Sequence, residues 1–274
     1  MTAGPARAAP GRWALSWAAV LGCLLVSGCL PIIGDSDGTD SAPQAGQCRD
    51  TPQAVLPEAH DPTPPVDCTE RHTLETYAVL RADGALDGGR LDAMGERCVQ
   101  RVQEFLGGDY EPTAVSVYYF GPSRAQRADG ARWVRCDVGV VTDTAFAGVR
   151  RLTGSLQDAF AGGVPPAYRR CLHSSPDPVA PQPLVSCQQP HFAQQMPTAV
   201  DLEQADAAYP GMDRLAEQAQ AECARTVRAQ LPEAGQALVV VPTAAMWRAG
   251  VRTAQCWATA APGEQLNDSE AQPA

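Results

Sequence analysis

The sequence predicts an α+β protein of two tandem homologous modules, in which each module is an antiparallel sheet packed by a helix and stapled by two disulfides. Three observations lead to this prediction. Eight cysteines fall into two sets of four, short motifs recur in both halves, and helical and strand-like periodicities follow one another in the same order in each half. Because helices repeat about every 3.6 residues and strands about every two, the sequence distinguishes them.

The chain begins with the features of a lipoprotein signal peptide. Arg7 and Arg12 precede an uncharged apolar run over 13–28, which ends in the sequence VSGC at Cys29. A basic start, a short apolar run and small residues before the cleavage point are typical of such signals, and the run is short for a membrane span. We expect residues 1–28 to be removed and Cys29 to be lipidated. An ordinary signal peptide or an uncleaved anchor helix is the alternative.

Composition excludes several classes of function. The formal net charge is −10, and an acidic surface repels phosphate polymers, so we expect no nucleic-acid partner. All 21 basic residues are arginines, which excludes a Walker phosphate loop and a lysine Schiff base. The segments 29–45 and 262–274 lack periodicity and predict a flexible tether and a disordered tail.

The eight cysteines that follow Cys29 favour disulfides. Their number is even, the chain is exported, and no CxxC pair suggests zinc or a redox motif. Alignment of the two halves gives two sets of comparable spacing, which are Cys48, Cys68, Cys98, Cys136 and Cys171, Cys187, Cys223, Cys256. If each module closes on itself, the possible pairings fall from about a hundred to about nine.

Three motifs support an internal duplication. VDCTERH at Cys68 and VSCQQPH at Cys187 both place a histidine four residues after the cysteine. Cys98, Val102 and Leu106 are echoed at the same spacing by Cys223, Val227 and Leu231. Pro122, Gly130, Arg132 and Cys136 are echoed by Pro242, Gly250, Arg252 and Cys256. We therefore expect two modules, at 46–164 and 165–261.

Each module has one predicted helix and three predicted strands. In the first, strands are expected at 73–81, 113–121 and 131–141, and a helix at 91–106. In the second, strands are expected at 192–200, 236–241 and 251–259, and a helix at 212–231. The segment 142–166 links the modules and is able to add a strand to one sheet.

Periodicity then favours one pairing among the nine. Steps of four place Cys98 and Cys223 on the apolar stripe of their helices. Alternation places Cys136 on the inward face of 131–141, with Trp133, Arg135 and Asp137 on the other face. Helix and strand cysteines can therefore meet, as Cys98–Cys136 and Cys223–Cys256. The remaining pairs, Cys48–Cys68 and Cys171–Cys187, would close short proline-rich loops.

His72 and His191 are the candidate site residues of the repeated motif. A zinc site would need about four ligands, and disulfides leave no thiolate, so we expect no metal. A catalytic pair of His72 with Glu75 has no counterpart at His191, where Gln194 stands at the position of Glu75. The hypothesis preferred here is structural, with both imidazoles partly buried and bonded to backbone beside a disulfide. A ligand or partner contact is the alternative.

Three tryptophans are further candidates for binding. Trp133 and Trp257 lie on the strand face opposite the cysteines, and Trp247 lies on a short helix that follows a proline. Large aromatic side chains either pack between modules or form a recognition surface. The sequence does not separate these two alternatives.

Several of these stretches resemble a known family. VDCTERHTLETYAV, VSCQQPH, the helix cysteine, RRLTGSL at 150–156 and the ending PTAAMWRAGVRTAQC are similar to the septum-formation domain of actinobacterial cell-envelope proteins, over about 46–260. An actinobacterial origin also fits the bias toward Ala, Arg, Gly and Pro. Arg71 and Gln194 depart from the proline and the glutamate of the family. The resemblance implies a role near cell division.

We therefore expect a lipid-anchored binding or scaffolding module on the outer face of the cytoplasmic membrane, without enzymatic activity, cofactor or metal. Its partner would be an envelope or division protein or a cell-wall component. Two alternatives remain, an envelope hydrolase that uses His72 and Glu75, and a carrier of a small ligand.

Overall fold

The computed structural model describes residues 42–177, 180–202, 208–248 and 250–267. The chain divides into the units Met1–Asp37 and Gly38–Ala274, and the description concerns the second unit. The expected signal peptide and Cys29 lie outside the described residues, as does most of the expected tether. Within the described parts, no helix has both the length and the apolar character that a membrane span requires.

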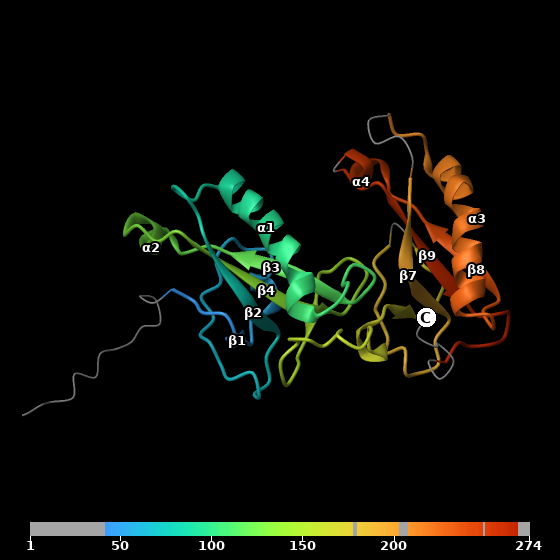
Figure 1. Ribbon diagram of the computed structural model, residues 1–274, viewed down its shortest axis with the longest axis horizontal. Coiled ribbons are helices and arrows are strands. Elements are labelled where there is room, and N and C mark those ends of the chain that lie inside the picture. Colours follow the sequence, from blue (N-terminus) through green and yellow to red (C-terminus); the bar gives the residue numbers. More distant parts are fainter. Residues whose placement is uncertain (1–41, 178–179, 203–207, 249, 268–274) are drawn as a thin grey trace, which may run out of the picture. The chain divides into compact units, whose positions relative to one another are not determined.

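The protein is α+β, as predicted, and contains two antiparallel sheets (Figure 1). The strand order of the first sheet is β1-β2-β4-β3, with β5 paired to β4, and that of the second is β6-β7-β9-β8. The strands of the first sheet are β1 (Cys48–Arg49), β2 (Leu74–Arg81), β3 (Val115–Phe120), β4 (Trp133–Val141) and β5 (Val149–Arg150). The strands of the second sheet are β6 (Cys171–Leu172), β7 (Ala193–Asp201), β8 (Gln236–Val240) and β9 (Thr253–Thr259).

Two long helices, α1 (Gly88–Leu106) and α3 (Met212–Gln230), each pack on one sheet. Asp87 caps α1 by accepting a hydrogen bond from the backbone N–H of Arg90, and Gly107 ends it in the left-handed conformation at φ 76°. The buried stripe of α1 includes Cys98, and that of α3 includes Cys223, as the steps of four predict. The short helices are α2 (Arg124–Ala128) and α4 (Ala244–Arg248).

One glycine sets how closely α1 approaches its sheet. A Cβ added at Gly95 would lie only 2.5 Å from the ring of Tyr119 on β3. A side chain at this position would therefore have to displace either the Tyr119 ring or the helix, and the core between helix and sheet holds Val102, Leu106, Val134 and Val138. Close packing of this kind loses contact energy when the two layers separate.

Within the described residues there are four disulfides, and they join the pairs expected from the sequence. Two connect a long helix to an inner strand of its sheet, Cys98–Cys136 on β4 and Cys223–Cys256 on β9. Two close the loops that precede β2 and β7, Cys48–Cys68 and Cys171–Cys187. Seven of the eight half-cystines are fully buried in the cores, the exception being Cys68.

The short strands β1 and β6 were not anticipated, because two residues are too few to show a period of two. The C-terminal prediction is wrong in part. Leu266 lies in the segment expected to be disordered, yet it is buried and forms a β-bridge with His191. Leu152 forms the corresponding bridge with His72 in the first sheet. The C-terminal segment therefore completes the second sheet up to at least Leu266.

Candidate binding site

The second sheet carries a cavity on the face that α3 does not cover. Side chains of β9 alternate, so that Cys256 points toward α3 while Gln255 and Trp257 point to the opposite face. On this face Gln255, Trp257, Gln195 of β7 and Val240 of β8 line a cavity of about 250 Å³. The cavity is slightly smaller than the pockets of roughly 300–1,000 Å³ that hold drug-sized ligands, so it suits a smaller molecule.

Two loops form further parts of the cavity wall, at 144–146 and around Gln182. Backbone hydrogen bonds join them, from Leu184 N to Thr142 O at 2.8 Å and from Thr144 N to Gln182 O at 2.9 Å. The Asp143 carboxylate accepts hydrogen bonds from the backbone N–H groups of Ala145, Ala147 and Gly148. These bonds fix the loop at Phe146, a residue held at φ 60°, a conformation that costs energy for a side chain of this size.

Arg170 is the basic residue of the cavity wall. Its side chain is 7% exposed and lies over the ring of Phe146, with 4.7 Å between the guanidinium carbon and the ring centroid. Its Nη1 donates to Gln195 Oε1 at 3.3 Å, while its Nε has no hydrogen-bond partner. Burial lowers the pKa of Arg170 to about 10. No ion pair with Arg170 occurs in the described parts of the chain.

Trp257 supplies a second unpartnered donor. The residue is 3% exposed and packs against Leu172 and Ala193, and its indole Nε1 is buried without a hydrogen-bond partner. A buried polar group without a partner costs roughly 1–3 kcal/mol. Two residues with such donors line one cavity, and a buried donor without a partner calls for an explanation.

The corresponding face of the first sheet is filled by a buried ionic network. Arg135 Nη2 donates to Asp61 at 2.6 Å, and Arg135 Nε donates to Asp137 at 2.8 Å. Thr76 Oγ1 donates to Asp137 at 2.8 Å, and Arg49 Nη1 donates to Thr76 at 3.0 Å. The alternation of β4 predicts Arg135 and Asp137 on this second face, but it does not show that the face is buried.

The two carboxylates of this network respond differently to their surroundings. Burial by itself would raise the pKa of Asp61, but hydrogen bonds from Thr63 and the charge of Arg135 outweigh burial and lower that pKa. Burial raises the pKa of Asp137, which is completely enclosed, despite the opposing charge of Arg135. Two arginines and two aspartates balance one another, so the chain itself neutralises the charges of this network.

The structure does not bring His72 and Glu75 together by a hydrogen bond. The His72 imidazole is fully buried, its Nδ1 lies 2.9 Å from Glu70 O, and its Nε2 has no partner. The Glu75 carboxylate accepts hydrogen bonds from Ser155 Oγ at 2.5 Å and from Leu156 N at 2.6 Å. These two hydrogen bonds hold the segment that follows β5 against Glu75 on β2.

His191 has a similar environment in the second sheet. It is fully buried, with Nδ1 2.8 Å from Gln189 O and Nε2 3.3 Å from Gln194 Oε1. Both histidines contact backbone beside a disulfide, as the structural interpretation of the motif predicts. They are more deeply buried than the partial burial that was expected.

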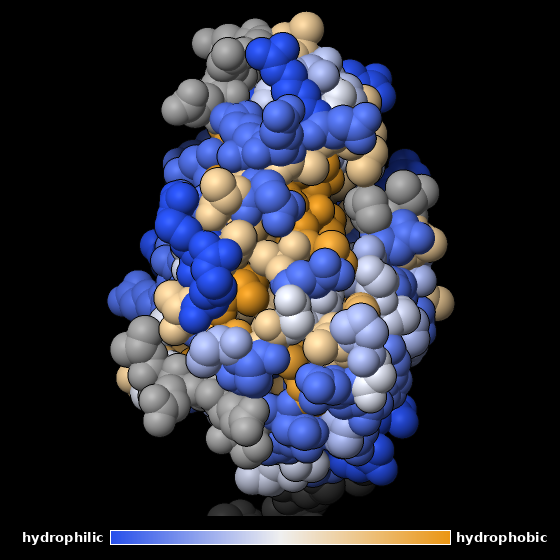
Figure 2. All heavy atoms as spheres, turned by 90° about the vertical axis from the view of Figure 1, so that its right-hand side faces the viewer, coloured by the Kyte–Doolittle hydropathy of each residue, from blue (hydrophilic) through white to orange (hydrophobic). Residues whose placement is uncertain are grey.

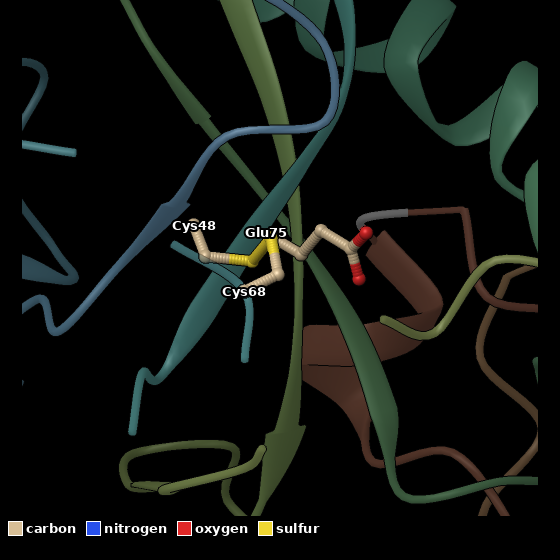
Figure 3. Close-up of side chains that lie close together, drawn as sticks. All are labelled: Cys48, Cys68 and Glu75. Atoms are coloured by element: carbon tan, nitrogen blue, oxygen red, sulfur yellow. A yellow bond between two sulfur atoms is a disulfide. The ribbon is translucent and has the colours of Figure 1, made fainter. Parts of the chain in front are cut away.

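Glu75 also belongs to a cluster with potential metal ligands. Its carboxylate and the sulfurs of Cys48 and Cys68 lie within 4.8 Å of one another, and Figure 3 shows the disulfide beside the Glu75 side chain. The two sulfurs are bonded to each other. Since metal ions bind thiolates, the chemistry of these donors does not fit a metal site while the disulfide is intact.

Of the other two tryptophans, Trp247 differs from the sequence expectation. Trp247 is 3% exposed and packs in the core under α3 with Leu202 and Leu215, so it neither packs between modules nor forms a surface. The guanidinium of Arg252 lies 4.0 Å from its ring centroid. Trp133 is half-buried and lines a hollow of about 490 Å³ where β4 begins.

A second surface feature lies beside β8. The residues 237–240 of this edge strand are apolar and half-buried, and Figure 2 shows a band of apolar side chains between hydrophilic ones on the face where α3 and β8 lie. We place the candidate site at the cavity rather than at this band, because two residues that line the cavity carry unpartnered buried donors. Sequence analysis found Trp257 but missed Arg170, which no periodic pattern distinguishes from other arginines.

Comparison with known proteins supports the resemblance seen in the sequence. The model of the Septum formation family matches residues 86–256 in one stretch, from just before α1 through Cys256 on β9. No curated protein and no solved structure matches the chain. The family match extends across both sheets and covers more than half of the 274 residues. The chain therefore belongs to the Septum formation family.

Proposed function

We propose that this member of the Septum formation family is a lipid-anchored binding or scaffolding protein of the cell envelope that acts during septum formation. One observation carries the binding function, namely the cavity on the second sheet with the buried, unpartnered donors of Arg170 and Trp257. Binding sites commonly retain polar groups that are satisfied only when the ligand is present.

We also propose that the chain contains two tandem homologous modules. Support comes from the equal strand order of the two sheets, the equivalent disulfides, and the bridges of Leu152 and Leu266 to the two histidines. Under this proposal the modules have diverged in function. The first fills its second face with Arg135 and its two aspartates, and the second keeps a cavity at the same place.

The alternative of an envelope hydrolase has less support from the geometry. A general base must be within hydrogen-bond reach of the proton that it removes. The Glu75 carboxylate is occupied by Ser155 and Leu156, and the His72 imidazole is fully buried. Both residues therefore have structural tasks, and a substrate would reach neither without a local rearrangement.

Anchoring is tested by metabolic labelling with a fatty acid. We expect the full chain to take up the label and the Cys29→Ala variant to lose it and leave the membrane fraction. Cys23→Ala is the matched control, since Cys23 lies inside the apolar run and should not affect labelling. Persistent labelling of Cys29→Ala would contradict the proposed anchor.

The role in septum formation is tested in dividing cells that express a fluorescent fusion of the full chain. We expect the fusion to concentrate at the septum, and deletion of the gene to delay septation and lengthen the cells. Uniform distribution around the envelope together with normal septa would contradict this role, while leaving the binding cavity to be tested separately.

A further inference from the structure

We infer that the cavity on the second sheet binds a small amphiphilic monocarboxylate, whose carboxylate accepts hydrogen bonds from Arg170 and Trp257. This inference rests on the proposed binding function and specifies the chemical class of the ligand. Four properties of the cavity lead to it: the hydrogen-bonding type of the unpartnered atoms, the charge, the shape of the wall and the comparison with the first sheet.

The unpartnered atoms accept no hydrogen bonds. Arg170 Nε and Trp257 Nε1 are both N–H donors with no lone pair available for bonding. A ligand that bonds to these two atoms must therefore offer a hydrogen-bond acceptor, which excludes a metal ion or an ammonium group as the bonding partner. A carboxylate has two oxygens and accepts several hydrogen bonds, and it bonds to a guanidinium more strongly than a neutral carbonyl does.

The charge of the wall favours one negative charge on the ligand. Among the described residues that line the cavity, Arg170 is the single basic one, and it is buried, so its positive charge is poorly screened by water. The acidic residue of the wall, Asp177, is exposed, and its carboxylate accepts a hydrogen bond from Ala180 N at 3.0 Å. A phosphate dianion would meet one cation and one anion, whereas a monocarboxylate balances Arg170 alone.

The rest of the wall is suited to an apolar body. Val240, Val241, Pro242, Met246 and Val251 line the cavity near the end of β8 and the start of α4. A cavity of about 250 Å³ equals the volume of about eight molecules of liquid water. The occupant is therefore a molecule of roughly ten non-hydrogen atoms rather than a polymer segment.

The first sheet offers a comparison in which the buried arginine comes from a different register position, since Arg135 corresponds to Gln255 and Arg170 corresponds to Gln47. Arg135 is buried with its guanidinium carbon 4.8 Å from the centroid of Phe120, much as Arg170 lies over Phe146 at 4.7 Å. Arg135 Nε donates to the carboxylate of Asp137, while Arg170 Nε has no acceptor. At the register position of Asp137 the second sheet has Trp257. The carboxylate that the chain supplies in one sheet is thus left to a ligand in the other.

The test titrates the full chain, solubilised from the envelope in a non-ionic detergent, by isothermal calorimetry. The probes are phenylacetate, 4-phenylbutyrate and octanoate, each beside its neutral primary amide, with inorganic phosphate as a further probe. We expect at least one acid to bind tenfold or more tightly than its amide, and phosphate not to bind. The aromatic and aliphatic acids distinguish the two kinds of apolar body.

Two variants separate a ligand site from a structural role. Arg170→Met preserves much of the volume, and we expect it to reduce acid binding at least tenfold while raising the melting temperature, because it removes a buried, unpaired cation. Trp257→Phe keeps an aromatic ring but removes the N–H donor, so we expect weaker acid binding and an unchanged fold. A purely structural Arg170 would give a lower melting temperature in Arg170→Met.

Three results would overturn the inference: no acid binds at millimolar concentration, acids and amides bind equally, or Arg170→Met binds the acids as the wild type does. Tight binding of phosphate would replace the carboxylate with a phosphate ligand. Each of these outcomes concerns the ligand alone. Lipid labelling of Cys29 and septal localisation are measured independently, so failure of the ligand class and failure of the envelope function remain distinguishable.

Discussion

Asp137 on β4 and Trp257 on β9 occupy corresponding positions in the two sheets. Each directly follows the cysteine that is bonded to the long helix. Each also pairs with an equivalent residue on the neighbouring strand, Asp137 with Thr76 on β2 and Trp257 with Gln195 on β7. One position carries a negative charge that neutralises Arg135, and the other carries an apolar ring with a single donor. With Asp137 at this position the face of the first sheet is filled by an ionic network, and with Trp257 the face of the second sheet has a cavity.

The buried network of the first sheet should be sensitive to the loss of its central cation. We expect Arg135→Met to lower the free energy of unfolding by about 3–5 kcal/mol, because Asp61 and Asp137 would remain buried without their partner. Urea unfolding of the oxidised protein measures the change. The control is Arg151→Met, which removes the exposed pair with Asp50 and should have no measurable effect. Equal effects of both variants would show that burial of the network contributes nothing.

Asp61 should make stability depend on pH in the acid range. Because its pKa is lower in the folded protein, the ionised carboxylate stabilises the fold. This contribution is fully present above the unfolded pKa of about 3.9 and is lost as the pH falls through the lower folded pKa. We expect wild type to be more stable than Asp61→Asn at pH 6 and the difference to shrink below about pH 4. A difference that stays constant from pH 6 to pH 3 would contradict this assignment.

The disulfides should dominate stability, and metal removal should have no effect. The Cys98–Cys136 and Cys223–Cys256 bonds span 38 and 33 residues, and each contributes roughly 3–4 kcal/mol in the loop-entropy model. We expect a reductant to lower the melting temperature strongly and a chelator to leave it unchanged. Thiol counting must accompany the melt. An unchanged melting temperature after complete reduction would show that the cores suffice, and unfolding by the chelator alone would indicate a metal.

Glu75 should be a structural residue. Glu75→Ala leaves Ser155 Oγ and the buried N–H of Leu156 without an acceptor, so we expect a loss of about 1–3 kcal/mol in the free energy of unfolding. Glu70→Ala, an exposed acid of the same motif, is the control and should have no effect. The rival hydrolase hypothesis predicts instead that Glu75→Gln or a His72 variant keeps its fold and disulfides and loses a measurable hydrolytic activity.

Trp247 and Trp133 should differ in their contribution to stability. Trp247 fills the core under α3, and we expect Trp247→Ala to cost about 3–5 kcal/mol because it leaves a large cavity. Trp133 is half-buried at the start of β4, so Trp133→Ala should cost much less. Thermal and urea unfolding of the two variants give the comparison. Comparable losses would mean that the hollow beside Trp133 closes around its ring.

The sequence by itself determined the elements that have a local period. Steps of four placed Cys98 and Cys223 on the buried stripes of α1 and α3, and alternation placed Cys136 and Cys256 on the inward faces of their strands. The disulfides between helix and strand cysteines could be predicted from these positions, because both residues of each pair face one core. The repeated motifs likewise placed His72 and His191 beside disulfides, at the start of corresponding strands.

Only the tertiary structure decided what covers the second face of each sheet. Asp61 reaches Arg135 across 74 positions of the chain, and the loop of Phe146 meets Trp257 at one cavity. Such contacts join segments without periodicity, so no spacing in the sequence announces them. The alternation of a strand tells which side chains share a face, but burial, ion pairing and an unpartnered donor depend on which loop folds over that face. For this reason the cysteine framework was predictable and Arg170 was not.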